Sequence, residues 1–325
     1  MLRALFVCAL LALGAAAYAA YLVFEAFDAP GPAVRDARIL IKRGDTPTRV
    51  AGRLEREGVL EDALVFRALI RLEQKGENIR AGEFLAVARS TPRQILTLLT
   101  EGPAVARKFT VPEGATTVEA LKVIAAAEGL VGNMPRDVPE GALLPETYHY
   151  VWNDTRADVV ARMERAMEKA VSAAMAIRPA DHPVTTALEL KTLASIVEKE
   201  TGLAEERPRV AAVFVNRLRR GMLMQSDPTT IYAVMRGTKP LGRSLTHKDL
   251  RLKDPYNTYT SRGLPPGPIA SPGKAALMAA ANPPVTKDLY FVADGTGGHV
   301  FGKSLAEHNR NVRAWRRVQR KRGLR

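Results

Sequence analysis

A carboxylate at the end of an apolar helical pattern is the feature of this sequence best suited to chemistry. It lies in the segment Leu193–Gly202. If residues advance by ~100° around a helix and Leu190 is set to zero, the apolar side chains of this segment centre near ~320°. Glu200 then falls at ~280°, within the apolar face, whereas Glu198 falls at ~80°, on the side shared with Lys191.

A carboxyl group on an apolar surface tends to keep its proton near neutral pH, because desolvation disfavours the ionised form. A protonated carboxyl of this kind is what general acid catalysis requires, so we predict that Glu200 is catalytic. The structural alternative is a helix-terminal glutamate that reaches solvent or pairs with Arg207 or Arg209.

The elements that must position Glu200 are helices followed by a stretch rich in turns. Helical patterns cover Thr185–Thr201 and Arg207–Arg220, and the chain becomes rich in turn residues after Gly221. Two short β-rich runs, Leu289–Ala293 and His299–Phe301, flank a glycine-rich turn and predict a hairpin. The fold class is therefore α+β.

Two polar clusters downstream are the candidate substrate-binding residues. Gln225, Ser226 and Asp227 precede a proline in a loop, where they can bind N-acetyl groups or support Glu200. The alternative is local: Asp227 or Thr229 would serve as the N-cap of a following helix.

Aromatic and amide side chains form the second cluster. Tyr256, Asn257 and Tyr259 suit sugar recognition, because an aromatic face packs on a pyranose ring and an amide binds its hydroxyls. Buried structural tyrosines are the alternative. No Cys/His ligand cluster is present in the sequence, which fits the expectation of chemistry that uses no metal and no cofactor.

Composition bounds the class of protein. The chain has 325 residues, 46% of them hydrophobic, and a formal net charge of +14, which predicts an anionic partner or surface. Much of the positive charge gathers near the C-terminus. Nucleic acid is the lowest-ranked partner, because no nucleic-acid-binding motif accompanies that charge. The single cysteine, Cys8, excludes an intrachain disulfide.

The N-terminus predicts the compartment. Ala4–Phe24 is an uncharged run of 21 residues. As a helix it would be about 31 Å long, enough to cross a bilayer. Arg3 precedes the run and Glu25 follows it, which predicts a single-pass anchor in the cytoplasmic membrane with the N-terminus inside. The alternative is a signal peptide cleaved after Ala19.

The chain is thus expected to comprise five parts. They are a transmembrane anchor at 1–24, a linker at 25–36, a small α/β subdomain at 37–104, a mixed α+β catalytic domain at 105–318 and a basic tail at 319–325. The predicted order of strand, two helices and strand in the small subdomain resembles a LysM-type glycan-binding module. A structural spacer is the alternative.

The ordered motifs resemble those of the YceG-like family of MltG-type endolytic murein transglycosylases. Six of them occur in family order: Leu193–Gly202, Gln225–Thr229, Tyr256–Tyr259, Gly263–Gly267, Phe291–Gly295 and His308-Asn309. Val111–Gly114 and Leu144–Tyr148 also resemble the family, although Leu144 and Glu146 stand where Phe and Asp are more usual. The resemblance covers roughly residues 37–318.

The resemblance implies an enzyme that cuts the β-1,4 bond between N-acetylmuramic acid and N-acetylglucosamine within peptidoglycan strands and leaves a 1,6-anhydromuramoyl end. The family's catalytic glutamate corresponds to Glu200. The orientation predicted for the N-terminal anchor places the catalytic domain in the periplasm or extracytoplasmic space. The resemblance also implies action beside peptidoglycan synthases, as a limiter of nascent strand length. Two alternatives stay open: a non-catalytic glycan-binding scaffold, and a muramidase-type hydrolase with Asp227 as its second carboxylate.

Overall fold

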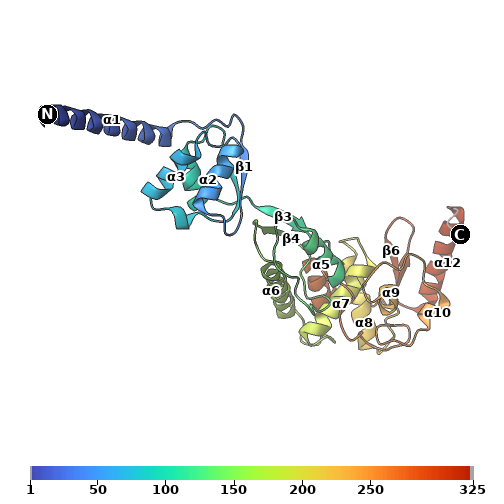
Figure 1. Ribbon diagram of the computed structural model, residues 1–325. Helices are drawn as coiled ribbons and strands as arrows, with labels where there is room; N and C mark the ends of the chain where they lie inside the picture. Colours follow the sequence, from blue (N-terminus) through green and yellow to red (C-terminus); the bar gives the residue numbers. More distant parts are fainter. Residues whose placement is uncertain (1, 323–325) are drawn as a thin grey trace. The chain divides into compact units, whose positions relative to one another are not determined.

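The computed structural model describes residues 2–322 and divides into two compact units. The first unit contains the chain up to Lys108, together with Glu128–Val131 and His149–Asp154. The second contains Phe109–Ala127, Gly132–Tyr148 and the chain from Thr155 onward. Helices and short antiparallel strand pairs occur in both, which confirms the mixed α+β class (Figure 1).

The first unit begins with a long apolar helix, α1 (Leu2–Asp28), which carries the one candidate membrane span among the described residues. Most of α1 is exposed, but Phe27 in its last turn is buried in the core of the unit. The elements after α1 are β1 (Ala37–Ile41), α2 (Pro47–Arg56), α3 (Ala63–Leu72), a single 3-10 turn (Gly76–Asn78), β2 (Gly82–Ala86) and α4 (Pro92–Thr100).

The order of strand, two helices and strand is the one that the sequence predicts. Strands β1 and β2 pair antiparallel, with Ala37 opposite Ala86 and Ile41 opposite Gly82. Helix α4 begins at Pro92 behind a capping box formed by Thr91 and Gln94. The segment expected to be a linker is hydrogen-bonded to the turn after β2, since the Gly31 N–H donates to the Arg89 carbonyl.

The second unit is built around helix α7. Its elements are α5 (Thr117–Ala126), α6 (Arg156–Ala176), α7 (Ala187–Glu200), α8 (Arg207–Arg219), α9 (Asp227–Met235), α10 (His247–Leu250), α11 (Lys274–Ala281), β5 (Tyr290–Ala293), β6 (His299–Gly302) and α12 (Leu305–Lys321). Strands β3 (Arg107–Thr110) and β4 (Thr147–Tyr150) pair in a separate sheet, and the division between the units falls within both strands.

Helix α7 is buried more completely than its amphipathic pattern indicates. It packs against α6, α8, α9 and α11, and every residue from Thr192 to Val197 is buried. The N-terminus of α7 is fixed by a capping box between Thr186 and Glu189. A helix held this way presents its last residue, Glu200, in a fixed position at the edge of the hydrophobic core.

The hairpin is also as expected. Strands β5 and β6 pair antiparallel from Tyr290 opposite Gly302 to Ala293 opposite His299. Helix α12 packs on both strands and continues into the predicted basic tail. Residues 323–325 of that tail lie outside the described residues.

Candidate active site

Glu200 is a half-buried carboxyl group at the C-terminal end of α7. Burial raises its pKa to about 7, and the nearby Asp227 carboxylate adds to the increase. The C-terminal end of a helix is its negative end, which further disfavours a carboxylate there. Near neutral pH the group is therefore divided between its acid and its base form, as a group serving in both roles requires.

Ser226 is the direct partner of this carboxyl. Its Oγ donates a hydrogen bond of 2.5 Å to Glu200 Oε1, which partly offsets the rise in the pKa of Glu200. Ser226 occupies the N-cap position of α9 without making a side-chain cap bond. The helix starts at Asp227, so the expectation that Asp227 or Thr229 is the N-cap is wrong. The hydroxyl that would normally cap α9 serves Glu200 instead.

Asp227 and Tyr259 form a second polar pair beside Glu200. The Tyr259 hydroxyl donates a 2.6 Å hydrogen bond to Asp227 Oδ1, and burial with this bond raises the pKa of Tyr259. Asp227 is exposed at the first position of α9. The pair therefore places an accessible carboxylate close enough to Glu200 to influence its pKa.

The loop that carries Ser226 is tied to the loop that carries Tyr259. The Ser226 N–H donates to Thr258 Oγ1 over 3.0 Å, and the Gln225 N–H donates to the Thr258 carbonyl. Gln225 adopts a left-handed φ of 48°, a conformation that is uncommon outside glycine. This backbone turn directs the exposed Gln225 and the buried Ser226 apart.

Asn257 holds the second loop together from within. It is fully buried, its Nδ2 donates to the carbonyls of Leu250 and Leu252, and its Oδ1 accepts from Thr230 Oγ1 and the Tyr259 N–H. The amide is thus used inside the protein. Its contact with a sugar remains a prediction that this geometry does not support.

Tyr256 packs among aromatic and cationic neighbours. Its ring centroid lies 4.8 Å from that of Tyr232, and the guanidinium of Arg236 lies 5.0 Å from its ring centroid. The Tyr256 side chain is half-buried against the hydrophobic core. Of the six predicted substrate-binding residues, Ser226, Asp227 and Tyr259 are the ones linked by contact or by charge to Glu200.

The two arginines that could have neutralised Glu200 are both engaged elsewhere. Arg207 lies 3.4 Å from a Glu198 oxygen and 3.8 Å from a Glu113 oxygen, and Arg209 pairs with Asp288 over 2.7 Å. The Glu198 carboxylate also accepts the Gly273 N–H. Glu198 is thus ion-paired, as expected, but its side chain is only 5% exposed and does not lie on a solvent-facing side of the helix.

The motif Val111–Gly114 closes around the end of α7. The Gly114 carbonyl accepts from Lys199 Nζ over 3.1 Å, next to Glu200 in the chain. Glu113 lies so close to Gly273 that a Cβ there would meet its Oε1 at 1.9 Å, so a larger residue at this position would force the Glu113 side chain to move. Segments far apart in sequence are thereby packed around one helix end.

Three further residues, His299, Glu206 and Arg217, were not predicted from the sequence. His299 Nδ1 lies 2.7 Å from Glu206 Oε2, and the His299 N–H donates to Glu206 Oε1. The third, Arg217, is buried and donates to the carbonyls of Leu289 and Met224. The charges of His299 and Arg217 both lower the pKa of Glu200. Nothing in the local sequence links β6 and α8 to α7, so only the fold reveals these neighbours.

An α+β unit with a half-buried acid at the end of a central helix defines a class of protein suited to acid–base chemistry. The chain belongs to the YceG-like family, whose sequence profile matches residues 39–314. This confirms the family resemblance drawn from the ordered motifs.

Curated relatives carry the name endolytic murein transglycosylase. That of Bacillus subtilis (strain 168) is 38% identical over 172 residues, covering 53% of this chain and 46% of the relative. That of Streptococcus pneumoniae (strain D39) is 37% identical over 177 residues, covering 53% of this chain and 31% of the relative. This chain therefore spans about half or less of the length of these relatives.

A solved structure is similar over most of the chain. It is the 2.6 Å crystal structure of a yceG-like protein from Listeria monocytogenes, 27% identical, with a TM-score of 0.52. The similarity covers 85% of this chain and 99% of that chain. The LysM-like character of the first unit is an expectation that these comparisons do not address.

Proposed function

We propose that this chain is an endolytic murein lytic transglycosylase with Glu200 as its single acid and base. The observation that carries the proposal is the pKa of Glu200, about 7, beside a serine that donates to one carboxyl oxygen. Family membership and the name shared by the curated relatives support the substrate class, the glycan strands of peptidoglycan.

The first step breaks the bond between C1 of N-acetylmuramic acid and the glycosidic oxygen. Protonated Glu200 gives its proton to that oxygen as the bond breaks, and positive charge develops at the sugar ring. Ser226 then stabilises the new carboxylate through its hydrogen bond to Oε1. The exposed Asp227 carboxylate supplies negative potential near the developing charge.

The second step forms the anhydro ring. The 6-hydroxyl of the same sugar attacks C1 and gives its proton to the Glu200 carboxylate, which restores the acid for the next cycle. No water is consumed, so the product carries a 1,6-anhydromuramoyl end. One carboxyl suffices, because the substrate supplies the nucleophile that a hydrolase must activate with a second group.

Glu200→Gln tests this assignment. The amide keeps the size of the side chain and can accept from Ser226, but it cannot donate a proton, so formation of anhydro ends should fall by at least about 10³-fold. Mass spectrometry of digested glycan strands measures the product, and circular dichroism checks the fold. Cleavage retained at the wild-type rate would show that another residue is the acid.

A hydrolase is the second candidate, because Asp227 lies near Glu200 and is exposed. In that mechanism Asp227 would activate water and the product would carry a reducing end. The same mass spectra decide between the two: anhydro ends support the transglycosylase, and reducing ends with an 18-dalton larger mass support the hydrolase, since the two products differ by one water.

The proposed location is the outer face of the cytoplasmic membrane. Helix α1 is long and apolar enough to span a bilayer, with a mean hydropathy of 2.1 over its best window. We propose that it is retained as an anchor, with the second unit outside and beside peptidoglycan synthases, where cleavage would limit the length of nascent strands.

A further inference from the structure

The first unit begins at the point where the apolar run of α1 ends. Phe24 is exposed at the end of that run, and Phe27, three residues later, is 2% exposed in the core of the unit. Three residues of helix advance about 4.5 Å. The headgroup layer on each side of a bilayer is about 5–7 Å thick. If α1 spans the membrane, the elements packed on its last turn lie at the level of the headgroups.

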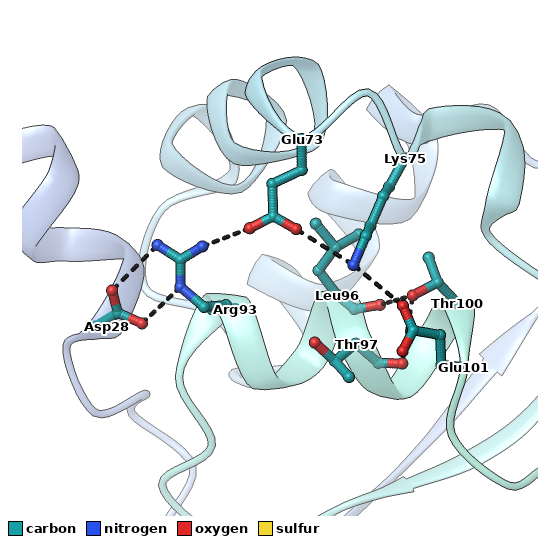
Figure 2. A network of polar contacts seen from close by, with 8 residues as sticks. All are labelled: Asp28, Glu73, Lys75, Arg93, Leu96, Thr97, Thr100 and Glu101. Atoms are coloured by element: carbon teal, nitrogen blue, oxygen red, sulfur yellow. Dashed lines mark hydrogen bonds and ion pairs between the residues drawn. The ribbon is translucent and has the colours of Figure 1, made fainter.

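Helix α3 is one of those elements. Figure 2 shows Arg93 of α4 between Asp28, the last residue of α1, and Glu73, the residue that follows α3. Lys75 extends the network from Glu73 to Glu101. The Arg93 guanidinium also lies 6.0 Å from the centroid of the Phe27 ring. These contacts fix the C-terminal end of α3 against the end of α1.

The outward side of α3 combines apolar and basic residues. We define the α3 face as Leu64, Arg67, Ala68, Arg71 and Leu72, which follow helical spacing and are all exposed. Leu64 is 67% exposed and Leu72 is 54% exposed. The opposite side of the helix is buried in the core. An apolar stripe flanked by arginines on a short amphipathic helix is typical of a helix that lies in a membrane interface.

The two arginines of the α3 face have no carboxylate partner among residues 2–322, unlike Arg93 nearby. They border an open groove of about 860 Å³, which also contains Pro47, Gln74 and Glu77. Arg67 and Arg71 carry two positive charges and Glu77 carries one negative charge, so the lining of the groove has a net positive charge. Guanidinium groups bind phosphate oxygens in a bidentate manner.

From these observations we infer that the α3 face binds anionic phospholipid headgroups of the membrane that α1 crosses. Leu64 and Leu72 would enter the boundary between headgroups and acyl chains, while Arg67 and Arg71 bind lipid phosphates. This inference rests on the proposed anchoring by α1. Its consequence is that the first unit meets the bilayer through two adjoining surfaces and is held at a fixed tilt.

The test uses the full chain in lipid nanodiscs with an environment-sensitive fluorophore on single cysteines. In a Cys8→Ala background, Leu64→Cys reports on the α3 face, and Leu85→Cys, an exposed leucine of the same unit on β2, is the matched control. Quenching by lipids with a nitroxide near the headgroup is compared in discs with and without about one third anionic lipid. The wild-type chain labelled at Cys8 and quenched by a deep nitroxide verifies that α1 is in the bilayer.

With anionic lipid in the disc, we expect quenching at position 64 to be at least twofold stronger than at position 85. The double variant Arg67→Gln, Arg71→Gln should reduce the quenching at position 64 at least twofold. Equal quenching at both positions, or quenching independent of anionic lipid and of the arginines, overturns the inference. A response at position 64 to glycan strands but not to lipid also overturns it and makes the groove a glycan site. Absence of quenching at Cys8 refutes the anchor and the inference together, whereas quenching at Cys8 without quenching at position 64 refutes the inference alone.

Discussion

The Glu200 carboxyl lies between opposing influences that keep its pKa near neutrality. Burial and Asp227 favour the protonated form, whereas Ser226, His299 and Arg217 favour the carboxylate. In the proposed mechanism, the protonated form breaks the glycosidic bond and the carboxylate serves the second step. A group fixed strongly in either form would perform one step and fail at the other.

Ser226→Ala should change the pH dependence of cleavage. Loss of the 2.5 Å hydrogen bond removes an interaction that favours the carboxylate, so the pKa of Glu200 rises further. Activity that depends on protonated Glu200 is lost as the pH rises through this pKa. The alkaline limb of kcat/KM should therefore move up by about one pH unit.

The control for this variant is Ser271→Ala, which removes a buried serine hydroxyl that has no hydrogen-bond partner among the described residues. Its pH profile should match that of the wild type. A limb that stays in place in Ser226→Ala, or moves to lower pH, would contradict the proposed role of Ser226.

Glu200 should also make folding stability depend on pH. Its pKa is raised from the ordinary 4.5 to about 7, so the folded state binds more protons than the unfolded state between these values. Stability contributed by this group is present below that range and is lost as the pH rises through it. Glu200→Gln removes the titration.

We expect Glu200→Gln to be more stable than the wild type at pH 8 by up to about 3 kcal/mol, since each pKa unit corresponds to about 1.4 kcal/mol. The difference should shrink toward pH 4.5. Urea denaturation at the two pH values measures it. A difference that is independent of pH would indicate that the pKa of Glu200 is not raised in the folded protein.

At the scale of elements, the site depends on two loops that Thr258 and Asn257 hold in register. Thr258 accepts the Ser226 N–H, while Asn257 fixes the Tyr259 N–H and binds Thr230 of α9. Helix α7 supplies Glu200 from a buried position, and the loops bring the polar partners to it. A buried helix and hydrogen-bonded loops together fix the positions of the site's side chains, as a preorganised site requires.

Asn257→Ala should destabilise the second unit and slow catalysis. It removes the hydrogen bonds of Asn257 to the Leu250 carbonyl, the Thr230 hydroxyl and the Tyr259 N–H, whereas the Leu252 carbonyl keeps Thr260 Oγ1 as a donor. This loss costs about 3 kcal/mol in the free energy of unfolding. We expect kcat to fall more than KM rises. If stability and kcat are unchanged and only KM rises, Asn257 contacts the sugar, as the sequence analysis predicted.

At the scale of the whole molecule, helix α1 leads directly into folded structure. Its last turn contributes Phe27 to the core and Asp28 to an ion pair with Arg93. The proposed anchor keeps all of α1, including the alternative cleavage site after Ala19, which lies within the helix.

We therefore expect the mature protein to keep its full N-terminal helix and to remain in the membrane fraction after washing with high salt. Intact-mass spectrometry of the purified protein measures this. A mature chain that begins at Ala20 would show that α1 is a cleaved signal and that the protein is released.

Much of the element order was predictable, because helix periods, caps and turn residues are local signals. Helix α7, helix α8 and the β5–β6 hairpin lie within a few residues of their expected bounds. Strand β4 was not predicted, since it has only four residues within a loop-rich stretch. Helix α11 was not predicted because its alanine-rich segment carries little periodic contrast.

The sequence by itself determined the family and the apolar N-terminal helix, and it led to the prediction of Glu200 over Glu198, because each depends on residues close together in the chain. Only the tertiary structure decided what surrounds Glu200. Ser226 reaches it across 26 positions, and Glu206 holds His299 across 93. Such pairings are set by how helices and loops pack in three dimensions, and no local spacing encodes them.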